Sequence, residues 1–267
     1  MDLRLHGKRA LVTGSTSGIG RAVALGLAGE GVAVVVHGRD AERAKETADA
    51  IASAGGTAAV ALGDLGNDSG AQHVADTAAA AFGGIDILVN NAGTTGGEDG
   101  WTASADDWLS LYDANLVSAV RLIRALTPAM RAAGWGRVIQ IGSAAHPYPL
   151  PRKAAYGATK AALVNLTVSL SKELAGTGIT VNTISPGPTL TDAFADFALA
   201  FARTHGLGDD VAGATATLLA GPLASPSARL TEPGEIAALA ALVASPFGAS
   251  INGANLRIDG GFTPTAN

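Results

Sequence analysis

Short aliphatic and β-branched runs alternate along the chain with longer, alanine-rich amphipathic stretches. Such alternation is typical of βαβ units, whose parallel strands are buried on both faces and are therefore continuously apolar. The pattern predicts seven strands, at residues 9–13, 33–37, 57–62, 85–90, 137–141, 179–184 and 254–258. It predicts helices at residues 18–29, 41–54, 69–81, 105–133, 154–175 and 233–245. The expected fold is α/β, a doubly wound parallel sheet of seven strands with helices on both faces.

The segment 186–230 departs from this rhythm, because glycine, proline and threonine punctuate its apolar patches and no strand is evident. Within it, Phe194, Phe197 and Phe201 recur at three- and four-residue steps, which predicts a helix with one aromatic face. Such a face usually packs in a core, and the alternative is an apolar wall over a substrate. Compact domains seldom keep long irregular segments unless these are lids or binding loops. We therefore expect one domain, 1–267, with 186–230 as a substrate-binding lid.

The composition excludes several classes of protein. With 48% hydrophobic and 15% charged residues, the chain is not disordered. Its 18 Lys and Arg and 23 Asp and Glu give a net charge of -5 with no basic cluster, so nucleic acid is not an expected partner. There is no cysteine, which excludes disulfides and cysteine chemistry and fits an intracellular compartment. The five histidines lack metal-ligand spacing, so no metal site is expected.

The first residues of the chain, Met1 to Arg9, carry charges where a signal peptide would need a long apolar run. No stretch approaches the roughly 20 continuous apolar residues that cross a bilayer. The sequence therefore predicts a cytoplasmic protein without a membrane partner.

The first predicted strand leads directly into Thr13-Gly14-Ser15-Thr16-Ser17-Gly18-Ile19-Gly20, where a helix begins. Glycines permit a tight turn and let the backbone approach a pyrophosphate, and the helix N-terminus attracts its negative charge. Taken alone, the motif also fits a glycine-rich turn that binds nothing.

The Gly-x-x-x-Gly-x-Gly spacing resembles that of the short-chain dehydrogenase/reductase family, in its classical subgroup, and further motifs follow in the family's order. They are Asn90-Asn91-Ala92-Gly93 after the fourth strand, Asn115 in the long helix, Ser143 after the fifth strand, Tyr156 and Lys160, and Pro186-Gly187 after the sixth strand. The chain is similar to 3-oxoacyl-acyl-carrier-protein reductase-like members from about Lys8 to Gly261. This resemblance implies a Rossmann-type fold and an oxidoreductase that interconverts a ketone and a secondary alcohol by hydride transfer.

The predicted catalytic chemistry centres on Tyr156. On a helix, Lys160 lies one turn away on the same face, and a nearby cation favours the phenolate form of a phenol whose ordinary pKa is about 10. Ser143 leaves the carboxyl end of a strand, the side of an open sheet where ligands bind. In isolation, such residues more often form a surface pair and a turn. By resemblance, Tyr156 is the acid/base, Lys160 also bonds the nicotinamide ribose, and Asn115 holds a water in a proton relay.

The end of the second strand predicts the cofactor. NAD-binding members of the family place an acidic residue there, whereas this chain has Gly38 followed by Arg39. Arg39 can pair with a 2′-phosphate through charge-assisted hydrogen bonds, which favours NADP (NADPH) over NAD. Asp40 lies 20 residues after Gly20 and is a ribose ligand by spacing alone, but we interpret it as the N-cap of the next helix.

The resemblance extends the expected cofactor site beyond the glycine loop. Asp64 and Leu65 resemble an adenine-binding pair, and Thr189 and Thr191 match contacts to the nicotinamide carboxamide and the pyrophosphate. The complete expected set is Gly14, Ser15, Thr16, Ser17, Gly18, Ile19, Gly20, Arg39, Asp64, Leu65, Asn91, Ala92, Gly93, Tyr156, Lys160, Pro186, Gly187, Thr189 and Thr191.

The aromatic helix in the lid segment favours a small, apolar carbonyl or alcohol substrate. By resemblance, the helices that begin at Ala105 and Ala154 pack subunits into a homotetramer or homodimer. One alternative is a catalytically silent NADP-binding regulatory or structural protein of the same fold. A sugar-nucleotide epimerase is a further alternative, but such chains resemble extended members with a larger C-terminal domain than the one that follows Pro186.

Overall fold

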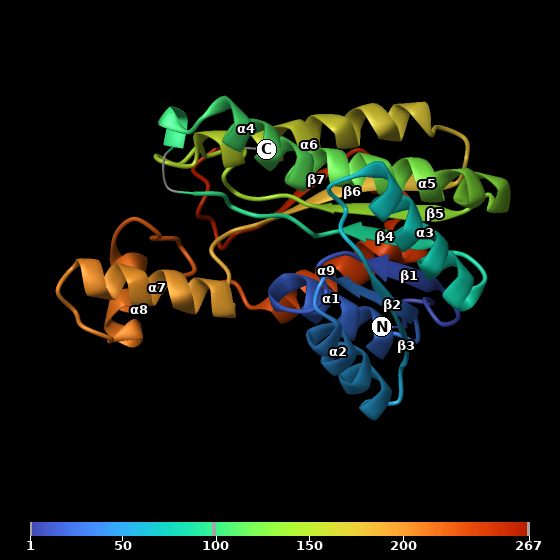
Figure 1. Cartoon of the computed structure of the whole chain (residues 1–267), viewed down its shortest axis with the longest axis horizontal. Helices are drawn as coiled ribbons and strands as arrows, with labels where there is room; N and C mark the ends of the chain where they lie inside the picture. Colours follow the sequence, from blue (N-terminus) through green and yellow to red (C-terminus); the bar gives the residue numbers. More distant parts are fainter. Residues whose placement is uncertain (1, 98–99, 266–267) are drawn as a thin grey trace.

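The parallel sheet predicted from the sequence forms the centre of the molecule (Figure 1). The computed structural model describes residues 2–97 and 100–265, so residues 1, 98–99 and 266–267 of the predicted domain lie outside the described residues. The strands are β1 (Arg9–Val12), β2 (Ala33–Gly38), β3 (Thr57–Leu62), β4 (Ile87–Asn90), β5 (Gly136–Ile141), β6 (Ile179–Pro186) and β7 (Asn255–Ile258). All neighbouring strands are parallel, in the order β3-β2-β1-β4-β5-β6-β7. This confirms the Rossmann-type fold class.

Helices cover both faces of the sheet (Figure 1). On one face lie α1 (Gly18–Gly29), α2 (Ala41–Ser53) and α9 (Pro233–Ala244), and on the other lie α3 (Asp68–Phe82), α5 (Ser118–Ala133) and α6 (Ala154–Glu173). Alternate residues of a strand face opposite layers of helices. Ile87 therefore packs in the hydrophobic core under α1 and α9, and Leu88 packs in the core under α3 and α5. None of the helices within the described ranges is long and apolar enough to cross a membrane.

The predicted helix 105–133 is divided. A capping box between Ser104 and Asp107 starts α4 (Ala105–Tyr112), a π-helical turn η2 (Asp113–Val117) follows, and α5 continues to Ala133. The extra residue in a π-turn does not alter hydrophobic periodicity enough to be visible in the sequence, and such turns are frequent at functional sites. Other predicted bounds differ from the observed ones by one or two residues, and two short 3-10 turns, η1 (Gly100–Thr102) and η3 (Pro246–Gly248), complete the order.

The segment 186–230 contains a helical hairpin, α7 (Asp192–Thr204) and α8 (Val211–Ala220), which extends away from the sheet (Figure 1). The predicted aromatic helix is α7. Phe194 and Phe201 pack with Ala198, Ala202, Ala214 and Leu218 in a core of the hairpin's own, whereas Phe197 is 45% exposed. Two of the three aromatic side chains therefore stabilise the hairpin instead of forming a wall.

The glycine loop lies where the strand order reverses. β1 pairs with β2 on one side and with β4 on the other, so the segments after β1 and β4 diverge from a common point. Ligands bind outside the carboxyl ends of the strands at such a switch point. The predicted position of the Gly14–Gly20 loop is confirmed.

Candidate active site

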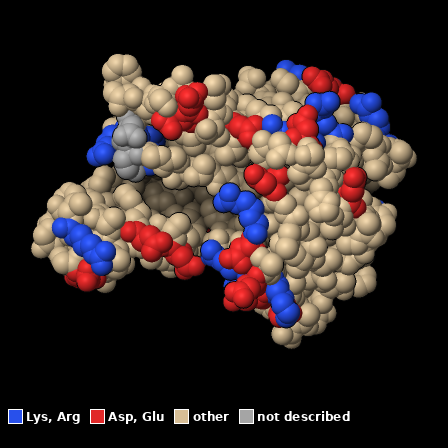
Figure 2. All heavy atoms as spheres, in the orientation of Figure 1, with Lys and Arg blue, Asp and Glu red and all other residues tan. Residues whose placement is uncertain are grey.

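A groove of about 740 Å³ opens at the switch point, between the sheet and the α7–α8 hairpin. Figure 2 shows this hollow, with basic and acidic side chains on its rim. Most of the expected cofactor-binding residues line it: Gly14, Thr16, Ser17, Gly18, Ile19, Gly20, Arg39, Asp64, Leu65, Asn91, Ala92, Gly93 and Thr191.

The glycine loop is fixed by backbone geometry and by Asn91. Gly14 and Gly18 have φ values of 61° and 52°, in the left-handed region that favours glycine. The Asn91 amide nitrogen donates to the Thr13 carbonyl at 2.9 Å and to the Gly14 carbonyl at 3.1 Å. A Cβ on Gly20 would overlap both the Gly14 carbonyl and the Asn91 amide. This close backbone cradle at a helix N-terminus fits a pyrophosphate.

His37 is a residue of this site that the sequence did not indicate. It is 3% exposed, and its Nδ1 accepts the Gly14 N–H at 3.2 Å while its Nε2 donates to the Gly63 carbonyl at 3.2 Å. Burial lowers the pKa of His37 to about 4, so the ring is neutral at physiological pH. His37 thus links the glycine loop to the end of β3.

Within residues 2–97 and 100–265, no group of three or more His, Cys, Asp or Glu side chains is arranged to hold a metal ion.

The end of β2 presents positive charge and leaves no space for a side chain at Gly38. A Cβ on Gly38 would overlap the Thr16 methyl group. Arg39 and Arg43 line the groove next to it. Asp40 accepts hydrogen bonds from the backbone of Glu42 and Arg43 at 3.0 and 3.2 Å, which confirms that it is the N-cap of α2.

Several expected cofactor-binding residues lie behind the groove wall. Ser15 is fully buried, because its hydroxyl bonds the Val12 carbonyl and its backbone N–H donates to the His37 carbonyl. Thr189 is 9% exposed and donates to the Gly187 carbonyl at 2.8 Å. Six expected residues do not line the groove: Ser15, Tyr156, Lys160, Pro186, Gly187 and Thr189. The side chain of Ser15 acts within the loop and cannot reach a ligand in this arrangement.

Tyr156 stands near the start of α6, with its phenol near the Ser143 side chain. Burial raises the pKa of Tyr156, while Ser143 acts in the opposite direction. The expected lowering by Lys160 is therefore not observed. Desolvation of the phenolate outweighs a cation whose Nζ lies 5.7 Å from the ring centroid.

Lys160 is 5% exposed and faces the sheet. Its Nζ donates to the Ile141 carbonyl at 2.8 Å, and burial lowers its pKa to about 8. This contact places the ammonium at the end of β5, the strand that leads to Ser143.

Asn115 is 2% exposed in the π-helical turn. Its Nδ2 donates to the Thr94 carbonyl at 2.9 Å and to the Thr159 hydroxyl at 3.1 Å, and its Oδ1 accepts the Thr94 N–H at 2.8 Å. The Thr159 hydroxyl in turn donates to the Tyr156 carbonyl at 2.7 Å. The side chain of Asn115 thus joins the loop after β4 to the turn of α6 that carries Tyr156.

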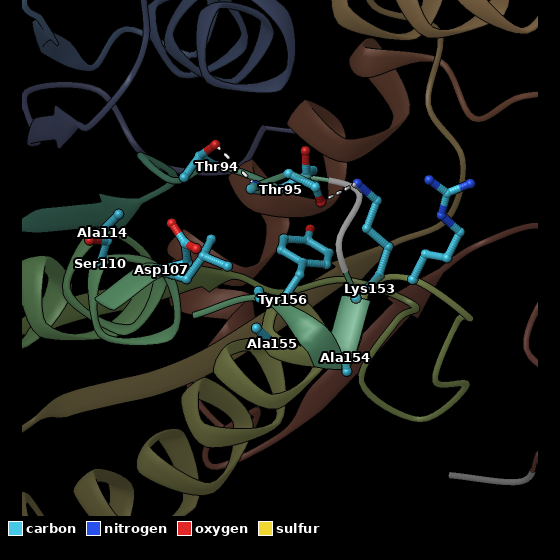
Figure 3. A pocket seen from close by; sticks show the side chains of 15 residues that line it. Thr94, Thr95, Asp107, Ser110, Ala114, Lys153, Ala154, Ala155 and Tyr156 are labelled. Atoms are coloured by element: carbon cyan, nitrogen blue, oxygen red, sulfur yellow. Dashed lines mark hydrogen bonds between the residues drawn. The ribbon is translucent and has the colours of Figure 1, made fainter. Parts of the chain in front are cut away.

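A second cavity of about 340 Å³ lies beside Tyr156 (Figure 3). Its walls come from the loop after β4, from α4 and from the start of α6. It shares Thr94, Thr95 and Ala114 with the groove. The two cavities therefore meet at the loop that Asn115 holds.

The chain is similar in sequence and in structure to known dehydrogenases and reductases. Residues 8–200 match the family model described as short chain dehydrogenase. The chain is 36% identical to D-threitol dehydrogenase of Mycolicibacterium smegmatis over 98% of this chain and 95% of that protein. It is 34% identical to the 3-oxoacyl-acyl-carrier-protein reductase FabG of Vibrio cholerae, over 97% and 98%. L-Sorbose reductase from Gluconobacter frateurii, solved with NADPH and L-sorbose, superposes with a TM-score of 0.94 at 33% identity and full coverage of both chains.

Proposed function

The chain belongs to the short chain dehydrogenase family, and from this premise we propose that it is an NADP(H)-dependent oxidoreductase in which Tyr156 exchanges the proton. As an enzyme of this family it acts on alcohol and carbonyl groups. The observation that supports this role is the position of Tyr156, which lies near Ser143 and lines a cavity that adjoins the groove.

The groove supports a dinucleotide as the cofactor. The Gly14–Gly20 backbone would hold the pyrophosphate, and Arg39 and Arg43 would hold a 2′-phosphate, because Gly38 brings no carboxylate to repel it. When bound, the nicotinamide supplies or accepts a hydride.

The proton is exchanged by the protein. In reduction, the protonated phenol of Tyr156 donates its proton to the carbonyl oxygen as a hydride reaches the carbonyl carbon, which gives the secondary alcohol. The raised pKa of Tyr156 keeps it protonated for this direction at neutral pH. Ser143 donates a hydrogen bond to the same oxygen, and the positive charge of Lys160 stabilises the phenolate that remains.

The lid assignment of 186–230 rests on the α7–α8 hairpin, which borders the groove through Thr191, Asp192 and Asp196. Phe194 and Phe201 pack inside the hairpin, and the exposed rings of Phe197 and Tyr148 line neither the groove nor the cavity beside Tyr156, so none of these side chains supports an apolar substrate. The names of the relatives span a polyol, a ketose and an acyl thioester. Because these substrates differ in kind, the relatives do not identify the substrate class of this chain, and it has to be inferred from the cavity.

A homodimer or homotetramer is part of the proposal. Leu109 on α4, Val117 in η2 and Val168 on α6 are 67%, 36% and 37% exposed, on the helices expected to pack between subunits. Light scattering after size exclusion tests this assembly, and a monomer at micromolar concentration contradicts it.

The catalytically silent alternative predicts binding without turnover. The test is to mix the protein with NADPH or NADH and a panel of ketones and to follow cofactor absorbance. Oxidation of NADPH by at least one ketone, faster than oxidation of NADH, supports the proposal. Tight NADPH binding without oxidation by any ketone would favour the regulatory alternative.

A further inference from the structure

The cavity beside Tyr156 is rich in hydrogen-bonding groups. Figure 3 shows Thr94 and Thr95 on one side of it and Asp107 with Tyr156 on the other. Ser110 adds a third hydroxyl. Apart from Tyr156, the only large apolar side chain among the described residues that line this cavity is that of Leu111; the remaining walls are mostly glycine and alanine.

Three of these polar groups are not committed to other contacts. Among the described residues, the hydroxyls of Thr95 and Ser110 make no hydrogen bond. Asp107 uses Oδ2 to accept from Ser104, and its Oδ1 has no partner in the same part of the chain. Because polar groups at a binding site cost affinity when a ligand leaves them unpaired, an apolar ketone is a poor occupant.

The cavity carries charges of both signs. Asp107 lines it together with Arg152 and Lys153 from the segment before α6, and Asp192 and Asp196 line the adjoining groove. Lys153, at the rim, donates to the Gly97 carbonyl at 3.3 Å (Figure 3). A substrate with several hydroxyls offers hydrogen-bond partners to the hydroxyl groups of Thr95 and Ser110 and to the Asp107 carboxylate at once.

We propose that this cavity binds the hydroxyl groups of a polyhydroxylated ketone or its alcohol, with Asp107 and Ser110 as the residues that determine specificity. The inference rests on the proposed function, since Tyr156 must face the reacting carbonyl. The proposed substrate is a ketose or a polyol that fits a cavity of about 340 Å³.

The experiment compares three substrates of equal chain length with NADPH: a ketohexose, 2-hexanone and 3-oxohexanoate. The ketohexose should have the highest kcat/KM, by at least about tenfold. Asp107→Asn should raise the KM for the ketohexose about ten- to hundredfold, as expected when a hydrogen bond to a charged group is lost. Ser110→Ala should raise it about two- to tenfold. The KM for 2-hexanone should remain nearly unchanged in both variants.

Asp106→Asn is the matched control, because Asp106 lies in the same first turn of α4 but does not line the cavity. It should alter none of these values. In Asp107→Asn the introduced amide retains an acceptor oxygen for Ser104, and thermal unfolding of this variant checks that the capping box is maintained.

A preference for 2-hexanone or 3-oxohexanoate overturns the inference while leaving the proposed function intact. So does an equal rise of KM for the ketohexose and 2-hexanone in Asp107→Asn, which would indicate a merely structural role. If none of the three ketones is reduced with NADPH or NADH, the proposed function fails with it.

Discussion

Thr16 and Gly38 should be coupled in determining which cofactor the enzyme accepts. A carboxylate at position 38 would reproduce the acidic residue of NAD-binding relatives, but its Cβ would overlap the Thr16 methyl group. The Thr16 Cβ itself would lie 3.6 Å from the new Cβ, which is ordinary van der Waals contact. Removing the methyl group by Thr16→Ala therefore makes the space that an aspartate needs.

The structure separates the steric effect from the electrostatic one. Gly38→Asp alone should lower the free energy of unfolding by about 1–3 kcal/mol, the usual cost of overpacking. Adding Thr16→Ala should recover most of this loss, so the two substitutions are non-additive. In the double variant the carboxylate repels the 2′-phosphate and accepts a ribose hydrogen bond, so NADPH should bind about ten- to hundredfold more weakly and NADH more tightly.

The assay is a denaturant titration together with binding titrations of NADPH and NADH, on the wild-type protein, both single variants and the double variant. Thr16→Ala alone is the reference for the double variant, because it measures the effect of losing the Thr16 side chain on both affinities separately from the added carboxylate. The reasoning is refuted if Gly38→Asp is as stable as the wild-type protein. It is refuted equally if the double variant retains the wild-type preference for NADPH.

Three further predictions concern residues around the groove. Arg39→Ala should weaken NADPH binding about ten- to hundredfold and leave NADH nearly unchanged in binding titrations, and an equal loss for both would contradict a 2′-phosphate contact. His37→Phe should raise the KM for both cofactors at nearly constant kcat, because it removes the hydrogen bonds to Gly14 and Gly63. His37→Gln should recover part of this loss, because its amide can both donate and accept a hydrogen bond. An unchanged KM in His37→Phe would show that the link from Gly14 to Gly63 does not hold the loop. Lys160 has a native pKa of about 8 against an ordinary value of 10.5, so the unfolded chain binds its proton more tightly. The free energy of unfolding of the wild-type protein should therefore rise relative to Lys160→Met between about pH 8 and 10.5, and parallel pH curves would contradict this.

The sheet was predictable because burial on both faces leaves a direct record in the sequence. Runs such as Val34, Val35 and Val36 are apolar at every position, as their packing into two cores requires. The family motifs then indicated which loops adjoin the ligand side.

Tertiary contacts account for what the sequence did not predict. The π-helical turn at Asp113–Val117 leaves the helical periodicity intact, and the hairpin helices bury only a small core of their own. His37 ends an apolar strand and is indistinguishable in sequence from any histidine, yet it bonds Gly14 and Gly63. The direction of the pKa shift of Tyr156 follows from burial, which the spacing to Lys160 does not reveal.

The central claim, that Tyr156 exchanges the proton, is tested most directly by Tyr156→Phe. The variant keeps the ring and removes the transferable proton, so the dissociation constant for NADPH should be nearly unchanged while kcat for ketone reduction falls about 10²- to 10⁴-fold. Tyr148→Phe is the matched control, because Tyr148 lies on the loop after Ser143 with its ring against Phe262, and its kcat should equal that of the wild-type protein. A Tyr156→Phe variant that reduces the same ketone at a near-normal kcat would contradict the account.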